Sequence, residues 1–188
     1  MTDWLRDHWL VEELRHGTAL KRYINAVWPE FDWGQVYRKF YAEYSLCGCA
    51  KQLGPTHALE MVSRCLVETG TSCLYTLLYR LTEEPVLRVL MARMKNDEIY
   101  HYKNFFDCYL RYQHDEQPPA RVVLKTLCKR ISEIDGEDAF ITFKHVFEQC
   151  VPDRPLLLTT NDYSVTTSWV SRSAIFRTTW LHRCFCDR

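Results

Sequence analysis

The chain has 188 residues, a length that suits one domain of ordinary size, and 47% of these residues are hydrophobic. This composition predicts a folded protein with a substantial core and excludes intrinsic disorder of the whole chain. The 24 basic and 24 acidic residues balance, so no overall field recruits nucleic acid or an anionic membrane, and we expect neither as a partner.

Two further absences in the sequence bear on location. No apolar run approaches the roughly 18 residues that are needed to cross a bilayer. The N-terminus lacks the basic start and apolar stretch of a signal peptide, which predicts a cytoplasmic protein. The nine cysteines are scattered and odd in number, which favours reduced, buried thiols over disulfides or a zinc site.

Helices are predicted along most of the chain, because each Pro or Gly cluster coincides with a break in the 3.6-residue periodicity of apolar residues. Asp32 and Thr56 are expected to cap two of the helices, and Pro85 is expected to open another. The expected helices span about 3–28, 33–53, 57–81 and 85–113, followed by two shorter ones after Pro119 and after Gly136. This order predicts an all-α, antiparallel helical bundle over residues 1–151.

The segment 152–188 has a different composition. Ten of its 37 residues are Ser or Thr, and it contains neither Lys nor Glu. A strand-forming extension, a poorly ordered terminus and the out-of-frame end of a truncated coding sequence all fit this pattern. We therefore expect an irregular tail and assign it no function.

Two Glu-x-x-His pairs occur in the predicted helices, Glu13 with His16 and Glu98 with His101. Each pair places a carboxylate and an imidazole one turn apart on the same face, which is the geometry of a metal-binding helix. Either pair alone occurs often by chance, so a metal site is indicated only together with a further residue.

Glu68 supplies that further residue, since it is the only formally charged residue between Arg64 and Arg80 in a helix that is apolar nearly all round. A buried carboxylate must meet a cation, a hydrogen-bond network or a metal. Glu68 lies fifteen residues before Glu83, at the expected turn, and Glu98 lies fifteen residues after it. Both therefore lie roughly 22 Å from the turn at one level, where a divalent cation would relieve their repulsion. The alternative is neutralisation of Glu68 by Arg64, with the other carboxylates on the surface.

The sequence also resembles a known family. The segment WLVEELRHG at 9–17 resembles the W-x-x-E-E-x-R-H-G segment of the soluble acyl carrier protein desaturases, and DEIYH at 97–101 resembles their D-E-x-x-H segment. Glu68 matches their lone glutamate helix, at similar intervals from both segments. The resemblance covers residues 4 to about 112 and implies a ferritin-like fold with two iron ions in its core.

The resemblance also implies roles for individual residues. The metal ligands it implies are Glu13, His16, Glu68, Glu98 and His101, and their donor chemistry suits iron or manganese. Trp9, Arg15 and Asp97 match positions behind the ligands, from which a carboxylate would orient His16. Thr71, one turn from Glu68, would act as a catalytic proton relay, or would bond only to a backbone carbonyl.

The chain departs from the family pattern in one respect: the family places another glutamate-bearing helix before the W-x-x-E-E segment. The first helix of the bundle and the sixth ligand are therefore expected to be lacking, and Glu43 is a weak substitute on the second helix. Acyl-carrier substrates do not carry over, so the small-molecule or acyl substrate stays open. An apolar face around Leu10, Val11 and Leu14 would then be uncovered, and a homodimer is one way to cover it.

These observations predict a ferritin-like protein with a non-haem, di-iron carboxylate site that acts as an oxygen-dependent oxidoreductase. The alternative is a non-catalytic ferritin-like binding or interaction module with an incomplete metal site. A hydrolase with a single divalent ion is disfavoured, because the sequence offers no nucleophile arrangement for it.

Overall fold

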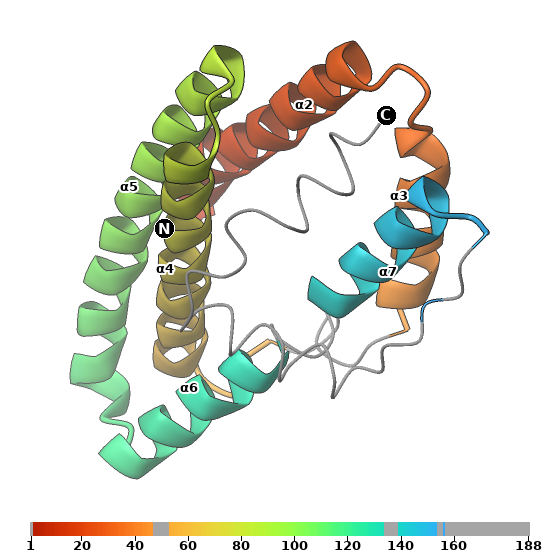
Figure 1. The fold of residues 1–188 in the computed structure, drawn as a ribbon. Coiled ribbons are helices and arrows are strands. Elements are labelled where there is room, and N and C mark those ends of the chain that lie inside the picture. The colour runs from red at the N-terminus through yellow and green to blue at the C-terminus, as the bar shows by residue number, and fades with distance from the viewer. Residues whose placement is uncertain (1, 47–52, 134–138, 154–155, 157–188) are drawn as a thin grey trace. The chain divides into compact units, whose positions relative to one another are not determined.

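The computed structural model describes residues 2–46, 53–133, 139–153 and 156. These residues are all-helical apart from turns and connections, as the sequence predicts. In chain order, the helices are α1 (Thr2–Trp4), η1 (Leu5–Trp9), α2 (Leu10–Val27), α3 (Trp33–Tyr44), α4 (His57–Leu81), α5 (Pro85–Glu116), α6 (Ala120–Glu133) and α7 (Ala139–Cys150). Figure 1 shows their course.

The chain divides into two compact units. Unit 1 comprises residues 1–30 and 53–130, and unit 2 comprises residues 31–52 and 131–188. Within unit 1, α4 and α5 form an antiparallel hairpin and α2 packs against α5. Within unit 2, α3 packs against α7. The expected domain boundary at residue 152 stays a prediction, because residues 157–188 lie outside the described part of the chain.

Local chemistry explains where the helices of unit 1 begin. The Thr56 hydroxyl accepts from the Leu59 backbone N–H at 3.3 Å, so it caps α4 as the sequence predicts. Glu84 caps α5 with its carboxylate, which accepts from the backbone N–H groups of Val86 and Leu87 at 3.0 and 2.6 Å. Pro85 occupies the first turn of α5, where no backbone donor is needed.

The second predicted helix is shorter than expected. It ends at Tyr44 rather than near Leu53, and residues 47–52 of the expected helix lie outside the described ranges. The Ser45 hydroxyl donates to the Ala42 carbonyl at 3.1 Å, and the Leu46 backbone N–H turns to the Glu43 carbonyl at 3.0 Å. Ser45 thus competes with the regular helical hydrogen bonds and closes the last turn early.

The first helix matches the expected span but contains a feature that periodicity does not reveal. Residues Leu5–Trp9 form a π-helical turn between α1 and α2. Trp4 precedes this turn and Trp9 is its last residue, and both rings lie edge-on to Phe105 of α5, with ring centroids 5.4 and 6.0 Å away. The turn therefore helps to cover the core formed by Met61, Cys65, Phe105 and Cys108.

Within the described residues, no helix is long and apolar enough to span a membrane.

Candidate metal centre

The structure brings the five sequence-predicted ligands together inside unit 1. Glu13 and His16 lie on α2, Glu68 lies on α4, and Glu98 and His101 lie on α5. Ligand atoms of Glu13, Glu68, Glu98 and His101 lie within 4.8 Å of one another. His16 is not one of these four residues, but its Nδ1 atom lies 3.4 Å from the Glu98 Oε1 atom, so His16 borders the group through Glu98. These five residues are called the inner cluster below.

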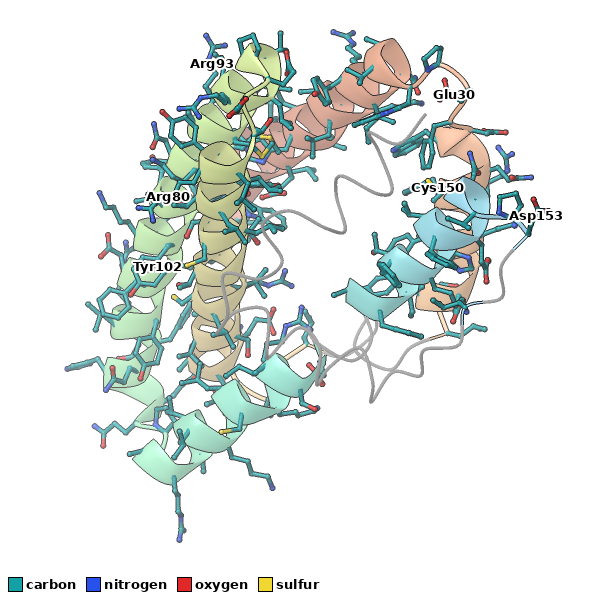
Figure 2. The ribbon with its side chains drawn as sticks, in the orientation of Figure 1. Glu30, Arg80, Arg93, Tyr102, Cys150 and Asp153 are labelled. Atoms are coloured by element: carbon teal, nitrogen blue, oxygen red, sulfur yellow. The ribbon has the colours of Figure 1, made fainter. Side chains whose placement is uncertain are left out.

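The inner cluster is shielded from solvent on most sides. His16, Glu68, Glu98 and His101 are buried, and only Glu13 keeps an appreciable exposed fraction. Glu98 and His101 lie between Arg93 and Tyr102 in the sequence of α5, and these two flanking residues are labelled in Figure 2. Three carboxylates therefore share a small volume with two imidazoles and little water. Such an arrangement is stable only with positive charge in its midst.

Both imidazoles present the same nitrogen to the carboxylates. The His101 Nδ1 atom lies 3.4 Å from Glu13 Oε1 and 3.5 Å from Glu68 Oε2. It also lies 3.4 Å from Glu98 Oε2. The Nδ1 atoms of His16 and His101 are fully buried and make no hydrogen bond. Each ring therefore offers a free nitrogen to the centre of the cluster, which is the position of a metal-binding nitrogen.

The other ring nitrogen of each imidazole is held by a carboxylate outside the inner cluster. His16 Nε2 lies 3.0 Å from Asp97 Oδ2, and His101 Nε2 lies 2.8 Å from Glu12 Oε2. Glu12 lies on the helix of His16 and Asp97 on the helix of His101, so each motif orients the histidine of the other. We call Glu12 and Asp97 the outer pair. With Nε2–H donated outward, each ring has the tautomer that leaves Nδ1 free to bind a metal.

Two further side chains connect this arrangement to its surroundings. Arg15 Nη2 lies 3.4 Å from Glu12 Oε1 and 3.1 Å from Asp97 Oδ2, so one guanidinium bridges the outer pair. The Trp9 indole N–H donates to Glu68 Oε1 at 3.3 Å. The resemblance predicts positions behind the ligands for Trp9, Arg15 and Asp97, and all three make such contacts.

Burial and charge act against each other on the titrating groups. Burial opposes the charged form of His101. The surrounding carboxylates outweigh burial and raise the pKa of His101 to about 12; they belong to Glu13, Glu68, Glu98 and Glu12. Burial and the charge of Glu98 raise the pKa of Glu68 to about 7. Burial would also raise the pKa of Glu98, but the two imidazoles outweigh it and lower that pKa. A proton on His101 thus supplies positive charge in the metal-free protein.

Glu12 and Tyr75 are site residues that the sequence argument missed. Glu12 could have been found, because an acidic residue precedes the glutamate of both Glu-x-x-His pairs, as Glu12 and Asp97 do. Tyr75 lies two turns after Glu68 on α4, and its ring lies edge-on to His16 with centroids 6.4 Å apart. Burial, followed by the charges of the inner carboxylates, raises the pKa of Tyr75.

Two other residues weighed in the sequence take different places. The Thr71 hydroxyl donates to the Val67 carbonyl at 2.9 Å, which is the backbone bond that the sequence left open as an alternative. Its role as a proton relay stays a prediction. Glu43, the weak substitute for a sixth ligand, belongs to unit 2, where it lies 2.6 Å from Lys144 Nζ and 2.8 Å from His145 Nε2.

Comparisons with known proteins add no assignment: no family model matches the chain, and neither the curated proteins nor the solved structures gave a significant match. The case for a metal centre therefore rests on the donor set. The donor atoms are carboxylate oxygens and imidazole nitrogens without a thiolate, the buried Nδ1 atoms lack partners, and carboxylates hold the Nε2 atoms. These features fit a metal cation held by oxygen and nitrogen ligands.

The outer pair gives a direct test of this geometry. We expect Glu12→Gln and Asp97→Asn each to weaken Mn²⁺ binding by about 10- to 100-fold, because the imidazole they orient loses its fixed tautomer. Isothermal titration with Mn²⁺ measures this loss. Asp107→Asn, which removes an exposed carboxylate from the same helix as Asp97, is the matched control and should leave the affinity unchanged. Equal affinities in all three variants would contradict the assignment.

Proposed function

We propose that the chain is a ferritin-like protein that holds two non-haem iron ions in the inner cluster and uses them in oxygen-dependent oxidation. The observation that carries the proposal is the pair of buried, unpartnered Nδ1 atoms turned toward three carboxylates. A structural ion-pair network does not require a buried ring nitrogen without a hydrogen bond on each histidine, whereas a metal site requires one free nitrogen on each histidine that binds the metal. The resemblance to the desaturases supports the same conclusion on independent grounds, from the motifs.

Charge balance supports two ions over one. Glu13, Glu68 and Glu98 contribute three negative charges, the outer pair contributes two, and Arg15 contributes one positive charge. Two divalent ions together with Arg15 neutralise all five carboxylates when both imidazoles are uncharged. One ion would leave an excess of two negative charges in a buried site, which is costly at low dielectric.

The residues of the chain have distinct roles in this proposal. The five inner residues would hold the metal, with manganese as an alternative to iron, and the bound iron would supply redox chemistry with dioxygen. Glu12 and Asp97 accept the Nε2–H protons and fix both imidazoles. Thr71 lies one turn from Glu68, and its hydroxyl oxygen keeps acceptor capacity while it donates to Val67, so it is our candidate for a proton relay.

A second candidate function has its own supporting observation. Because the pKa of His101 is raised to about 12, the metal-free cluster is held together by an imidazolium among carboxylates. A protein that never binds metal could use the same network as structural support. This corresponds to the non-catalytic binding or interaction module, and metal loading discriminates between the two.

We expect two Fe²⁺ or Mn²⁺ ions to bind per chain and to raise the melting temperature, since a ligand at 100 times its Kd adds about 2.7 kcal/mol to the free energy of unfolding. At pH 7 binding should release at least one proton, because His101 must lose its proton to become a ligand. Metal analysis after gel filtration, thermal melts and a pH-indicator titration measure the three quantities. An unchanged melting temperature up to millimolar metal would favour the non-catalytic module.

Oxygen reactivity is tested separately from binding. Protein loaded anaerobically with Fe²⁺ and mixed with aerated buffer is expected to form Fe³⁺ faster than free Fe²⁺ in the same buffer. The ultraviolet absorbance of Fe³⁺ carboxylates follows this reaction, and the Asp107→Asn variant again serves as the control. Bound iron that oxidises no faster than free iron would leave a metal-binding protein without the oxidase activity.

A further inference from the structure

The balance of basic and acidic residues holds for the chain as a whole but not for α6. This helix carries four basic side chains, Arg121, Lys125, Lys129 and Arg130, and a single acidic one, Glu133. The field of such a local surplus reaches over one Debye length, roughly 8–10 Å, so distant acidic residues do not cancel it in physiological salt. The composition of the whole chain therefore does not decide what α6 attracts.

The exposed side of α6 carries two rows of side chains that run along the helix. Three exposed cationic side chains, spaced four residues apart, form the cationic row: Arg121, Lys125 and Lys129. Three exposed apolar side chains at the same spacing form the apolar row: Ala120, Leu124 and Cys128. Helical geometry places the two rows side by side. Leu124 is 61% exposed, and Ile131, one turn further along the same helix, is 48% exposed.

The remaining side of α6 is partly covered by the rest of the chain. Val122, Val123, Thr126 and Leu127 are half-buried there, and no residue of α6 is fully buried. A partner that encloses a helix on all sides cannot reach this half-buried side. A flat partner surface, by contrast, can contact the cationic row and the apolar row at once.

The acidic residue that directly precedes this segment is engaged elsewhere. Glu116, the last residue of α5, accepts from the backbone N–H groups of His57 and Ala58 at 3.1 and 2.8 Å. Its charge therefore interacts with the first turn of α4, where a helix favours an anion. Figure 1 shows α6 following this end of α5.

We propose that the exposed side of α6 docks on an anionic lipid surface, with the cationic row among the headgroups and the apolar row at the boundary with the acyl chains. An anionic bilayer presents negative charge directly above an apolar layer, so it complements both rows. A soluble acidic polymer complements the cationic row alone. The inference does not depend on the metal centre.

The test uses the full, metal-free chain and vesicles of phosphatidylcholine with or without phosphatidylserine. Sedimentation of the vesicles measures the bound fraction at low and at high salt. We expect binding to the anionic vesicles to be about 100-fold tighter than to the neutral ones, because each Lys or Arg near an anionic surface contributes about fivefold. High salt should weaken the binding, since it screens the headgroup charge.

Two charge variants locate the cationic row. The double variant Arg121→Gln/Lys125→Gln should bind the anionic vesicles about 25-fold more weakly, as expected for the loss of two cations. The matched control is Arg93→Gln/Lys103→Gln, which removes two exposed cations from α5 and should bind as the wild type does. Arg93 lies 23 residues before Glu116, which is roughly 35 Å from the end of α5 that leads to α6.

Two leucine variants test the apolar row. Leu124→Ser should weaken binding by about tenfold, because the side chain no longer leaves water for the acyl boundary. Leu74→Ser is the matched control, since Leu74 is 50% exposed on α4 and lies seventeen residues, or roughly 26 Å, after His57 at the start of that helix. Circular dichroism and the oligomeric state of each variant are measured alongside.

The lipid and salt dependence of the wild type tests the proposal without any substitution. Absence of binding, or equal binding to neutral and anionic vesicles, would show that the proposal is wrong. Equal losses in the α6 variants and their controls would mean a general attraction without a site on α6. If polyglutamate competes for the cationic row and Leu124→Ser has no effect, the partner is an acidic polymer rather than a bilayer. If Leu124→Ser dissociates a dimer that binds no vesicles, this side of α6 is an interface between copies of the chain.

Discussion

Replacing Glu68 with Gln is expected to make the metal-free protein more stable by about 3 kcal/mol at pH 8, while it removes most of the stabilisation that metal provides. The pKa of Glu68 is raised from 4.5 to about 7 in the folded protein by burial and by Glu98. A shift of that size corresponds to about 3 kcal/mol. Glutamine keeps the shape and the acceptor for the Trp9 indole but never ionises.

The sign of this effect follows from proton binding. Between pH 4.5 and 7 the folded protein keeps the Glu68 proton and the unfolded chain does not, so the stability of the wild type falls as pH rises through this window. The Gln variant lacks this fall. The stability difference should therefore vanish below pH 4.5 and reach its full value above pH 7.

Urea unfolding of the metal-free protein at pH 4.5 and pH 8 measures the difference, and melts with Mn²⁺ measure the loss of metal stabilisation. Asp107→Asn controls for the removal of any carboxylate from unit 1. A Gln variant that is less stable than the wild type at pH 8 would show that the interaction of the Glu68 carboxylate with the His101 imidazolium outweighs the cost of burying that carboxylate. Retained metal stabilisation would show that Glu68 is not a ligand.

Replacing His101 with Gln is expected to have the opposite effect and to destabilise the metal-free protein by roughly 3–5 kcal/mol at neutral pH, as removal of one partner from a buried ion pair does. The His101 side chain is fully buried and its Nδ1 atom faces three carboxylates. Without the positive charge of His101, the negative charges of Glu68 and Glu98 remain in a buried site with less positive charge to balance them.

The pH dependence again has a definite direction. The pKa of His101 is raised from 6.5 to about 12, so its contribution to stability is fully present below pH 6.5 and is lost as pH rises toward 12. The gap between wild type and variant should therefore narrow at alkaline pH, by at most about 1.4 kcal/mol per pH unit. Denaturation at pH 6 and pH 9 measures this change, and a constant gap would contradict the imidazolium.

The double variant with both Gln substitutions connects the two results. Because Glu68 and His101 interact directly, their separate effects should not add. The double variant should be more stable than His101→Gln alone, since one of the uncompensated carboxylates is gone. Additive effects would mean that the two residues do not share a cluster.

The apolar periodicity, together with Pro and capping residues, predicted where α4 and α5 begin, because these signals act over a few residues, whereas α5 ends at Glu116, three residues beyond the predicted end. Thr56 and Pro85 are clear cases. The grouping of Glu68 with Glu98 was also within reach of the sequence, since the rise per residue fixes their level once the hairpin turn is known. Helix geometry alone likewise placed each Glu and His of a pair on one face.

Other features were decided by the tertiary structure alone. Each carboxylate of the outer pair contacts the histidine of the other helix: Glu12 of α2 contacts His101, and Asp97 of α5 contacts His16. These contacts depend on how α2 and α5 are rotated against each other. The inward direction of both Nδ1 atoms follows from those contacts. The partial exposure of Glu13 depends on which side chains from other helices cover α2, and the apolar periodicity of α2 does not specify those side chains.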